Sequence, residues 1–163
     1  MGSSPKLSRD PATLSGHRIL VVEDEYFLAD DISRALRSYG AEVAGPVGNL
    51  DDVFQILDES RDLDGAVLDV NLRSEMIFPI ARLLRSRRVP FVFTTGYDKA
   101  SIAPEFHDVM LWENRYRGNA PRTELAGRPR RDLIRVLVSP LRSELPLDPR
   151  ARTGWPVSSA SSR

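Results

Sequence analysis

The stretch RILVVEDE (residues 18–25) is an apolar run that ends in three consecutive acidic residues. Two other short runs also change from apolar to polar at their ends. GAVLD (65–69) ends in an aspartate, and PFVFTTG (90–96) ends in two threonines and a glycine. Short, β-branched, almost wholly apolar runs are typical of strands buried on both faces of a parallel sheet. The sequence therefore predicts a parallel sheet that carries polar side chains where its strands end.

Helical patterns lie between these runs, which indicates an α/β fold with a parallel sheet. Apolar residues recur at helical spacing after the first run, and Asn49 stands where a helix N-cap is expected. We expect helices over 25–39, from Asn49 onward, over 75–86 and, in short form, within 100–106. We expect strands over 17–23, 41–47, 64–69, 90–95 and 109–112.

Length and composition favour one globular domain. The chain has 163 residues, of which 41% are hydrophobic and 28% charged, as is ordinary for such proteins. No apolar run is long enough for a transmembrane helix, and the polar N-terminus lacks the apolar centre of a signal peptide. The absence of cysteine fits a cytoplasmic protein.

The formal net charge of zero hides an asymmetry along the chain. Residues 1–114 carry 12 basic and 19 acidic residues, whereas residues 115–163 carry 11 basic and 4 acidic. We therefore divide the chain into a flexible leader (1–16), a domain core (17–113), a diverged segment with one helix (114–142, the helix over 132–141) and a disordered tail (143–163). The basic end shows no repeated interleaving of aromatic residues with its arginines and no helix-turn-helix pattern, so nucleic acid is not an expected partner.

The polar strand ends predict a metal site. Ligands of open α/β sheets bind beyond the carboxyl ends of the strands, which would bring Glu23, Asp24, Asp69 and Thr95 into one pocket. Crowded carboxylates repel one another and need a hard cation, for which Mg²⁺ suits oxygen ligands. We expect Asp24 and Asp69 to be direct ligands, Glu23 to act through water, and the carbonyl of Asn71 to be a third ligand. A shared ion requires the carboxyl groups of Asp24 and Asp69 to lie within about 8 Å of each other.

Such a pocket could perform phosphoryl transfer. Asp69 would attack a phosphoryl donor and become an aspartyl phosphate, the metal would neutralise charge on the transferred oxygens, and the Thr95 hydroxyl would bind one of them. Each residue alone is better explained as an ordinary strand-end or helix-opening residue. Their occurrence together at the ends of three different runs favours the site.

Three motifs, LVVEDE (20–25), AVLDVNL (66–72) and VPFVFTTGY (89–97), together resemble a response-regulator receiver domain over about residues 17–113. The resemblance implies a flavodoxin-like three-layer α/β/α fold with a five-stranded parallel sheet and an atypical C-terminal part. It implies a phosphoacceptor at Asp69, Mg²⁺ at Asp24, and a sensor histidine kinase as phosphoryl donor. The FTTGY segment (93–97) is similar to the Phe-Ala-Thr-Gly-Tyr signature of a stand-alone subfamily, whose members often pair with HWE-type kinases.

The function that this resemblance implies is that of a cytoplasmic two-component signalling protein with a downstream protein partner. It would not be a turnover enzyme, since it would catalyse only its own phosphorylation and dephosphorylation. An aspartate-nucleophile phosphatase would require an acid where Asn71 stands. Dinucleotide binding would require a glycine-rich turn after the first strand, where this chain has Glu-Asp-Glu.

The chain departs from receivers at the lysine that normally follows the fifth strand. Its only lysines are Lys6 and Lys99, and Asn114 falls at the expected position. Arg115 or Arg117 could replace that charge, although a planar guanidinium is a different donor from a compact ammonium. An alternative is therefore a degenerate receiver that binds its partner independently of phosphorylation. A frame-shifted or diverged C-terminal ending would explain the departure, and translating the gene in its other reading frames tests it.

Overall fold

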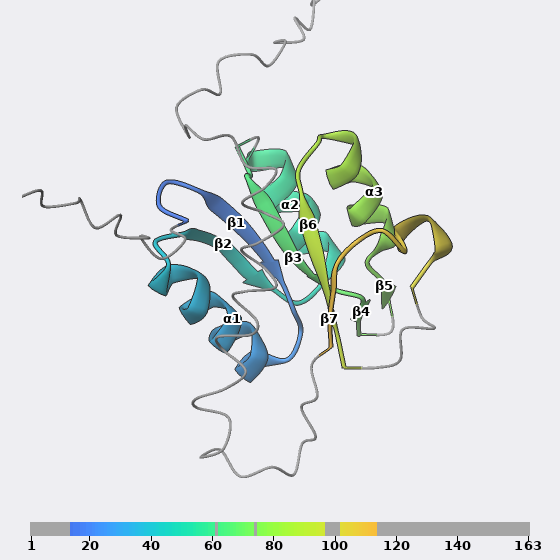
Figure 1. Cartoon of the computed structure of the whole chain (residues 1–163), viewed down its shortest axis with the longest axis horizontal. Coiled ribbons are helices and arrows are strands. Elements are labelled where there is room, and N and C mark those ends of the chain that lie inside the picture. Colours follow the sequence, from blue (N-terminus) through green and yellow to red (C-terminus); the bar gives the residue numbers. More distant parts are fainter. Residues whose placement is uncertain (1–13, 61, 74, 97–101, 114–163) are drawn as a thin grey trace, which may run out of the picture.

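A computed structural model describes residues 14–60, 62–73, 75–96 and 102–113 of the chain. The main feature is a parallel five-stranded sheet in the order β2-β1-β3-β6-β7, drawn in Figure 1. Its strands are β1 (Arg18–Val22), β2 (Glu42–Val47), β3 (Gly65–Asp69), β6 (Phe91–Thr95) and β7 (Leu111–Glu113). The helices are α1 (Tyr26–Ser38), α2 (Leu50–Glu59) and α3 (Phe78–Ser86), with a short 3₁₀ helix η2 (Pro104–Phe106). This is the flavodoxin-like α/β fold expected from the sequence.

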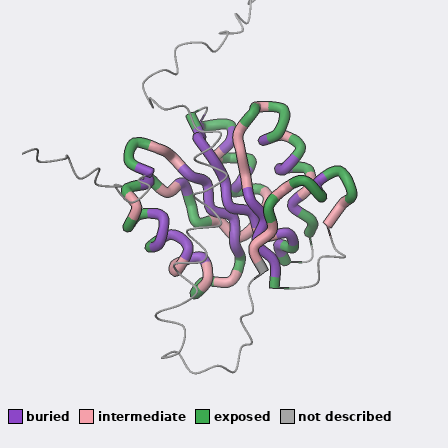
Figure 2. Tube along the Cα trace, viewed as in Figure 1, coloured by how far each residue is buried: buried purple, intermediate pink, exposed green. Residues whose placement is uncertain are grey.

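Side-chain alternation along the strands creates three layers. Ile19 and Val21 of β1 pack in one cluster with the apolar face of α1, whereas Leu20 and Val22 pack in a second cluster with α2 and α3. All four side chains are fully buried, and Figure 2 shows the central strands as the most buried part of the molecule. Burial on both faces explains why these runs are nearly all apolar.

A two-stranded antiparallel hairpin follows β3, formed by β4 (Asn71–Leu72) and β5 (Glu75–Met76). The helix predicted over 75–86 therefore begins three residues later, at Phe78, with Ile77 as its N-cap and Pro79 in its first turn. Proline is tolerated there because that N–H has no intrahelical partner. The hairpin lies beyond the carboxyl end of β3, and the chain then runs back along the sheet as α3 (Figure 1).

The described residues 102–110, which precede β7, are fastened to α3. Phe106 of η2 is fully buried, and its ring contacts Phe78, Phe91 and Phe93 with centroids 5.6, 6.1 and 5.6 Å away. From α3, Arg85 places its guanidinium over the Phe106 ring at 4.8 Å and pairs with Asp108 at 3.0 Å. The short helix expected within 100–106 is thus one 3₁₀ turn that carries a buried aromatic ring.

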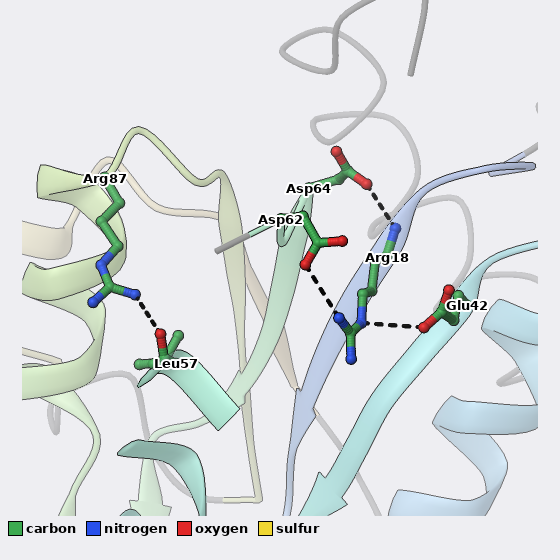
Figure 3. A network of polar contacts seen from close by, with 6 residues as sticks. All are labelled: Arg18, Glu42, Leu57, Asp62, Asp64 and Arg87. Atoms are coloured by element: carbon green, nitrogen blue, oxygen red, sulfur yellow. Dashed lines mark hydrogen bonds and ion pairs between the residues drawn. The ribbon is translucent and has the colours of Figure 1, made fainter. Parts of the chain in front are cut away.

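The amino-terminal end of the sheet is held by Arg18, as Figure 3 shows. The Arg18 guanidinium pairs with Glu42 at 3.2 Å and with Asp62 at 3.1 Å, and its backbone N–H donates to Asp64 Oδ2 at 2.7 Å. In the same view, Arg87 donates to the Leu57 carbonyl at the end of α2 at 3.0 Å. Glu42 and Asp62 at this end therefore have a basic partner.

Leu14, which the sequence places in the leader, is buried and donates its N–H to the Tyr39 carbonyl at 2.7 Å. Other predictions concern residues outside the described ranges: the lysines, Asn114, Arg115, Arg117, the helix over 132–141 and the tail from 143. Among the described helices, none has the length and apolar character needed to cross a membrane.

Candidate functional site

The three acidic side chains predicted to meet do lie together. Glu23 and Asp24 follow β1 directly, and Asp69 is the last residue of β3, which pairs with β1 in the register Val22↔Leu68. One carboxylate oxygen from each of Glu23, Asp24 and Asp69 lies within 4.8 Å of the others. This separation is well inside the limit of about 8 Å that a shared cation sets.

Burial and mutual repulsion make this cluster costly when all its members are ionised. The Glu23 side chain is only 5% exposed; burial, followed by the charge of Asp69, raises the pKa of Glu23 to about 8. Burial also raises the pKa of Asp69 to about 6; the Asn71 N–H opposes this rise and the charge of Asp24 adds to it. A bound cation or a retained proton would relieve this repulsion.

Backbone N–H groups orient all three carboxylates. Glu23 Oε1 accepts from the Glu25 N–H at 3.0 Å, Asp69 Oδ1 from the Asn71 N–H at 3.3 Å, and Asp24 Oδ2 from the Arg73 N–H at 3.1 Å. Hydrogen bonds of this kind fix the direction of metal-binding side chains. The loop after β1 and the hairpin after β3 therefore organise one site together.

The acids of this cluster differ from several other described acids in their electrostatic surroundings. Across the described ranges, ion pairs join arginines to Asp30, Glu42, Asp62, Glu105 and Asp108. Within these same ranges, no ion pair reaches Glu23, Asp24 or Asp69. A group of hard oxygen donors without a basic partner among the described residues fits a divalent cation better than it fits a structural salt-bridge network.

The two remaining predicted residues lie beside the cluster. Asn71 follows Asp69 by two positions and is exposed; its carbonyl as a metal ligand stays a prediction. Thr95 ends β6, the strand next to β3, where Asp69 pairs with Thr94, and it is 4% exposed. Its hydroxyl therefore belongs to the same sheet edge as Asp69.

Two features of the site were not anticipated from the sequence. Gly48 lies against the acidic loop, and a Cβ at this position would be only 3.1 Å from Asp24 Cα. Arg73 adopts a left-handed φ of 45° in the hairpin turn and supplies the N–H that holds Asp24. Both depend on how separate strands approach in space, although a glycine directly before the Asn49 cap could have suggested a close contact.

Known proteins resemble this chain in structure. No model of a protein family matches its sequence, and no curated protein matches it either. The solution structure of SdrG from Sphingomonas melonis Fr1 is 30% identical, covers 66% of this chain and 88% of its own, and has a TM-score of 0.56. A BeF3-activated conformation of SdrG from Pseudomonas melonis Fr1 is 29% identical over 63% and 87% of the two chains, with a TM-score of 0.52.

A more distant similarity supports the same fold. The crystal structure of a response regulator receiver protein from Sinorhizobium medicae WSM419 is 20% identical, covers 81% of this chain and 99% of its own, and has a TM-score of 0.62. The carboxylate cluster and the strand order are both features of the described residues.

Proposed function

This chain belongs to the response-regulator receiver family, and from that premise we propose that it accepts a phosphoryl group from a sensor histidine kinase onto Asp69, with Mg²⁺ bound beside it. The observation that carries this proposal is the convergence of Glu23, Asp24 and Asp69 within 4.8 Å at the carboxyl edge of the sheet. The BeF3-activated form of SdrG supports it, because beryllofluoride imitates a phosphoryl group on a carboxylate. Since such kinases phosphorylate their partners in the cytoplasm, this proposal also locates the chain there.

The transfer follows from the chemistry of the cluster. With a pKa of about 6, Asp69 is mostly ionised at neutral pH and can act as a nucleophile. An Asp69 oxygen donates an electron pair to phosphorus and forms the new O–P bond. The P–N bond to the phosphohistidine breaks, and its electron pair stays on the imidazole nitrogen, which takes a proton from water.

The neighbouring groups stabilise the transferred phosphoryl group. Asp24, Asp69, the Asn71 carbonyl and, through water, Glu23 would hold Mg²⁺, which supplies charge neutralisation for the phosphoryl oxygens when it is bound. The Thr95 hydroxyl would donate to one of those oxygens. The chain is thus a phosphoacceptor that takes up one group, rather than an enzyme with continuous turnover.

Phosphorylation by a small donor tests this function without the kinase. The purified chain with Mg²⁺ and radiolabelled acetyl phosphate should incorporate up to one phosphoryl group per molecule, and Asp69→Asn should incorporate none. Asp58→Asn is the matched control, because Asp58 is an exposed acid on α2 outside the site. Equal labelling of the Asp69→Asn protein would contradict the assignment of the acceptor.

The degenerate receiver remains the alternative, and one observation favours it. Thr95 of β6 pairs with Glu113, the last residue of β7, so the next residue in the chain is Asn114, where no positive charge is available. No labelling of the unsubstituted protein, together with unchanged partner binding in Asp69→Asn, would favour this alternative. Labelling restored or increased by Asn114→Lys would place the defect at that position.

The kinase would dock beside Asp69 on the start of α1. Tyr26 and Phe27 are 76% and 55% exposed, contact each other edge to face at 5.5 Å, and follow the acidic loop directly. Exposed aromatic residues are characteristic of protein interfaces. The sequence likeness of residues 93–97 to the stand-alone subfamily makes an HWE-type kinase the first donor to try.

Comparing two donors separates docking from chemistry. Tyr26→Ser should slow phosphotransfer from a phosphorylated HWE-type kinase and leave labelling by acetyl phosphate unchanged. Phe54→Ser, an exposed aromatic substitution on α2, is the control and should affect neither reaction. Equal slowing with both donors would show that Tyr26 supports the site itself rather than the kinase.

A further inference from the structure

Among the described residues, the acids of the pocket have no ion-pair partner, so a phosphoryl group on Asp69 would need a cation of its own. A phosphoryl group on Asp69 carries close to two negative charges at neutral pH. Mg²⁺ and the Thr95 hydroxyl would bind two of its oxygens, and the remaining oxygen needs another donor. In residues 14–113 as described, none of the ion pairs involves Glu23, Asp24 or Asp69, so a described arginine outside these ion pairs is a candidate donor for this oxygen.

Among the described residues, Arg73 is an arginine that the fold brings to this pocket. The β4–β5 hairpin turns at this residue and returns it to the end of β1, where its N–H donates to Asp24 Oδ2 at 3.1 Å, across 49 positions in sequence. The residue is exposed, and its guanidinium takes part in none of the ion pairs of the described residues. A long side chain that starts beside a carboxylate of the cluster can reach a group on Asp69.

The backbone of Arg73 is evidence that the residue is held at this place. Its φ of 45° is uncommon for a residue with a side chain, and the hydrogen bond to Asp24 requires the N–H to point into the pocket. Asparagine, aspartate and glycine adopt this conformation more readily than arginine. Arginine at this position therefore brings a positive charge to a turn that a smaller residue would form more easily.

We propose that Arg73 is a phosphoryl-binding residue of this receiver, with its backbone N–H orienting Asp24 and its guanidinium pairing with an oxygen of the phosphoryl group on Asp69. This assignment rests on the proposed phosphoacceptor function. A guanidinium suits the task because its N–H groups form a fork that matches phosphate oxygens. Arg73 would then supply, from the hairpin after β3, the charge that is missing where Asn114 follows β7.

The proposal predicts opposite effects on two ligands. A positive side chain beside the pocket repels Mg²⁺ and attracts a phosphoryl group. Arg73→Asn removes the charge but keeps the N–H and a residue that tolerates a positive φ. The binding of Mg²⁺ alone should therefore be equal or tighter in this variant, whereas beryllofluoride at saturating Mg²⁺ should bind about tenfold more weakly. Arg73→Lys should recover most of the loss.

Two titrations on the full chain test this, one of Mg²⁺ by calorimetry and one of beryllofluoride by ¹⁹F NMR. Arg88→Asn is the matched control, because Arg88 is also an exposed arginine with a positive φ, of 57°, but lies beyond the far end of α3. It should leave both affinities unchanged.

Each other outcome of these titrations contradicts either the Arg73 assignment or the function on which it rests. Unchanged beryllofluoride binding in Arg73→Asn overturns the assignment. Weaker binding of both ligands also overturns it, because it would mean that the side chain only supports the hairpin. Failure of the unsubstituted protein to bind beryllofluoride would instead overturn the phosphoacceptor function on which the assignment rests.

Discussion

Replacing Glu23 by glutamine should stabilise the metal-free protein at alkaline pH. Glutamine keeps the size of the side chain and an oxygen that can accept the Glu25 N–H, a bond of 3.0 Å in this structure, but it cannot ionise. We expect the Glu23→Gln protein to be more stable than the unsubstituted protein near pH 8, and the two to be about equally stable near pH 5.

The magnitude follows from the pKa of Glu23. Burial, and then the charge of Asp69, raises this pKa from 4.5 to about 8. A carboxyl group whose pKa is higher in the folded chain holds its proton more tightly when folded, so stability is lost as the pH rises. The loss begins near the unfolded value of 4.5 and is complete near 8. At about 1.4 kcal/mol per pKa unit, the full effect is on the order of 5 kcal/mol.

Urea unfolding followed by circular dichroism, in EDTA and across this pH range, measures the effect. The unsubstituted protein should lose stability more steeply with pH than Glu23→Gln, and Asp58→Asn, an exposed acid-to-amide change on α2, should follow the unsubstituted protein. Added Mg²⁺ should recover stability at the alkaline end, because a ligand of the folded state stabilises it. Parallel pH curves for Glu23→Gln and the unsubstituted protein would refute the reasoning.

Three other substitutions test packing and local structure. Gly48→Ala should weaken Mg²⁺ binding in a calorimetric titration, since a Cβ 3.1 Å from Asp24 Cα would displace the acidic loop. Gly96→Ala is the control and should bind Mg²⁺ normally, because a Cβ there meets nothing within 4 Å. Equal affinities of the two variants would show that the loop is free to adjust. Phe106→Ala should lower the free energy of unfolding by about 3 to 5 kcal/mol, because it empties the centre of an aromatic cluster; a loss below about 1 kcal/mol in urea unfolding would contradict this packing. Asn49→Ala should lower the free energy of unfolding by about 1 kcal/mol in the same measurement. The substitution removes the Asn49 side-chain oxygen that accepts the Asp52 N–H in the first turn of α2 at 2.9 Å. An unchanged free energy of unfolding would mean that water replaces the cap.

The centre of the sheet was predictable from the sequence because β1, β3 and β6 are buried on both faces. Their short, β-branched apolar runs favour strands, and the helices between the runs indicate parallel connections. The hairpin after β3 was not predictable, since two-residue strands such as Asn71–Leu72 carry no periodic pattern. Met76 and Ile77 continue the apolar pattern of the next helix, which explains why that helix was predicted to begin too early.

The site was predictable only in part, for a similar reason. Acidic residues at strand ends can be located from the sequence, since the carboxyl ends of parallel strands share one edge. The contact of Gly48 with Asp24 depends on how the loop after β2 packs on the loop after β1. The bond from the Arg73 N–H depends on where the hairpin turns. Such contacts are decided by the assembled fold rather than by local sequence.

The aromatic cluster around Phe106 connects β6 of the sheet to the exposed side of α3. Every second residue of β6 lies on the same face of the sheet, and these residues are Phe91, Phe93 and Thr95. The rings of Phe91 and Phe93 contact the ring of Phe106. Outside that ring sits the Arg85 guanidinium. Densely packed rings cannot slide past one another without opening voids. We therefore expect β6 and the segment over 102–110 to move together. A displacement of β6, which ends in Thr95, would therefore also shift the ion pairs that Arg82 and Arg85 of α3 form at the surface.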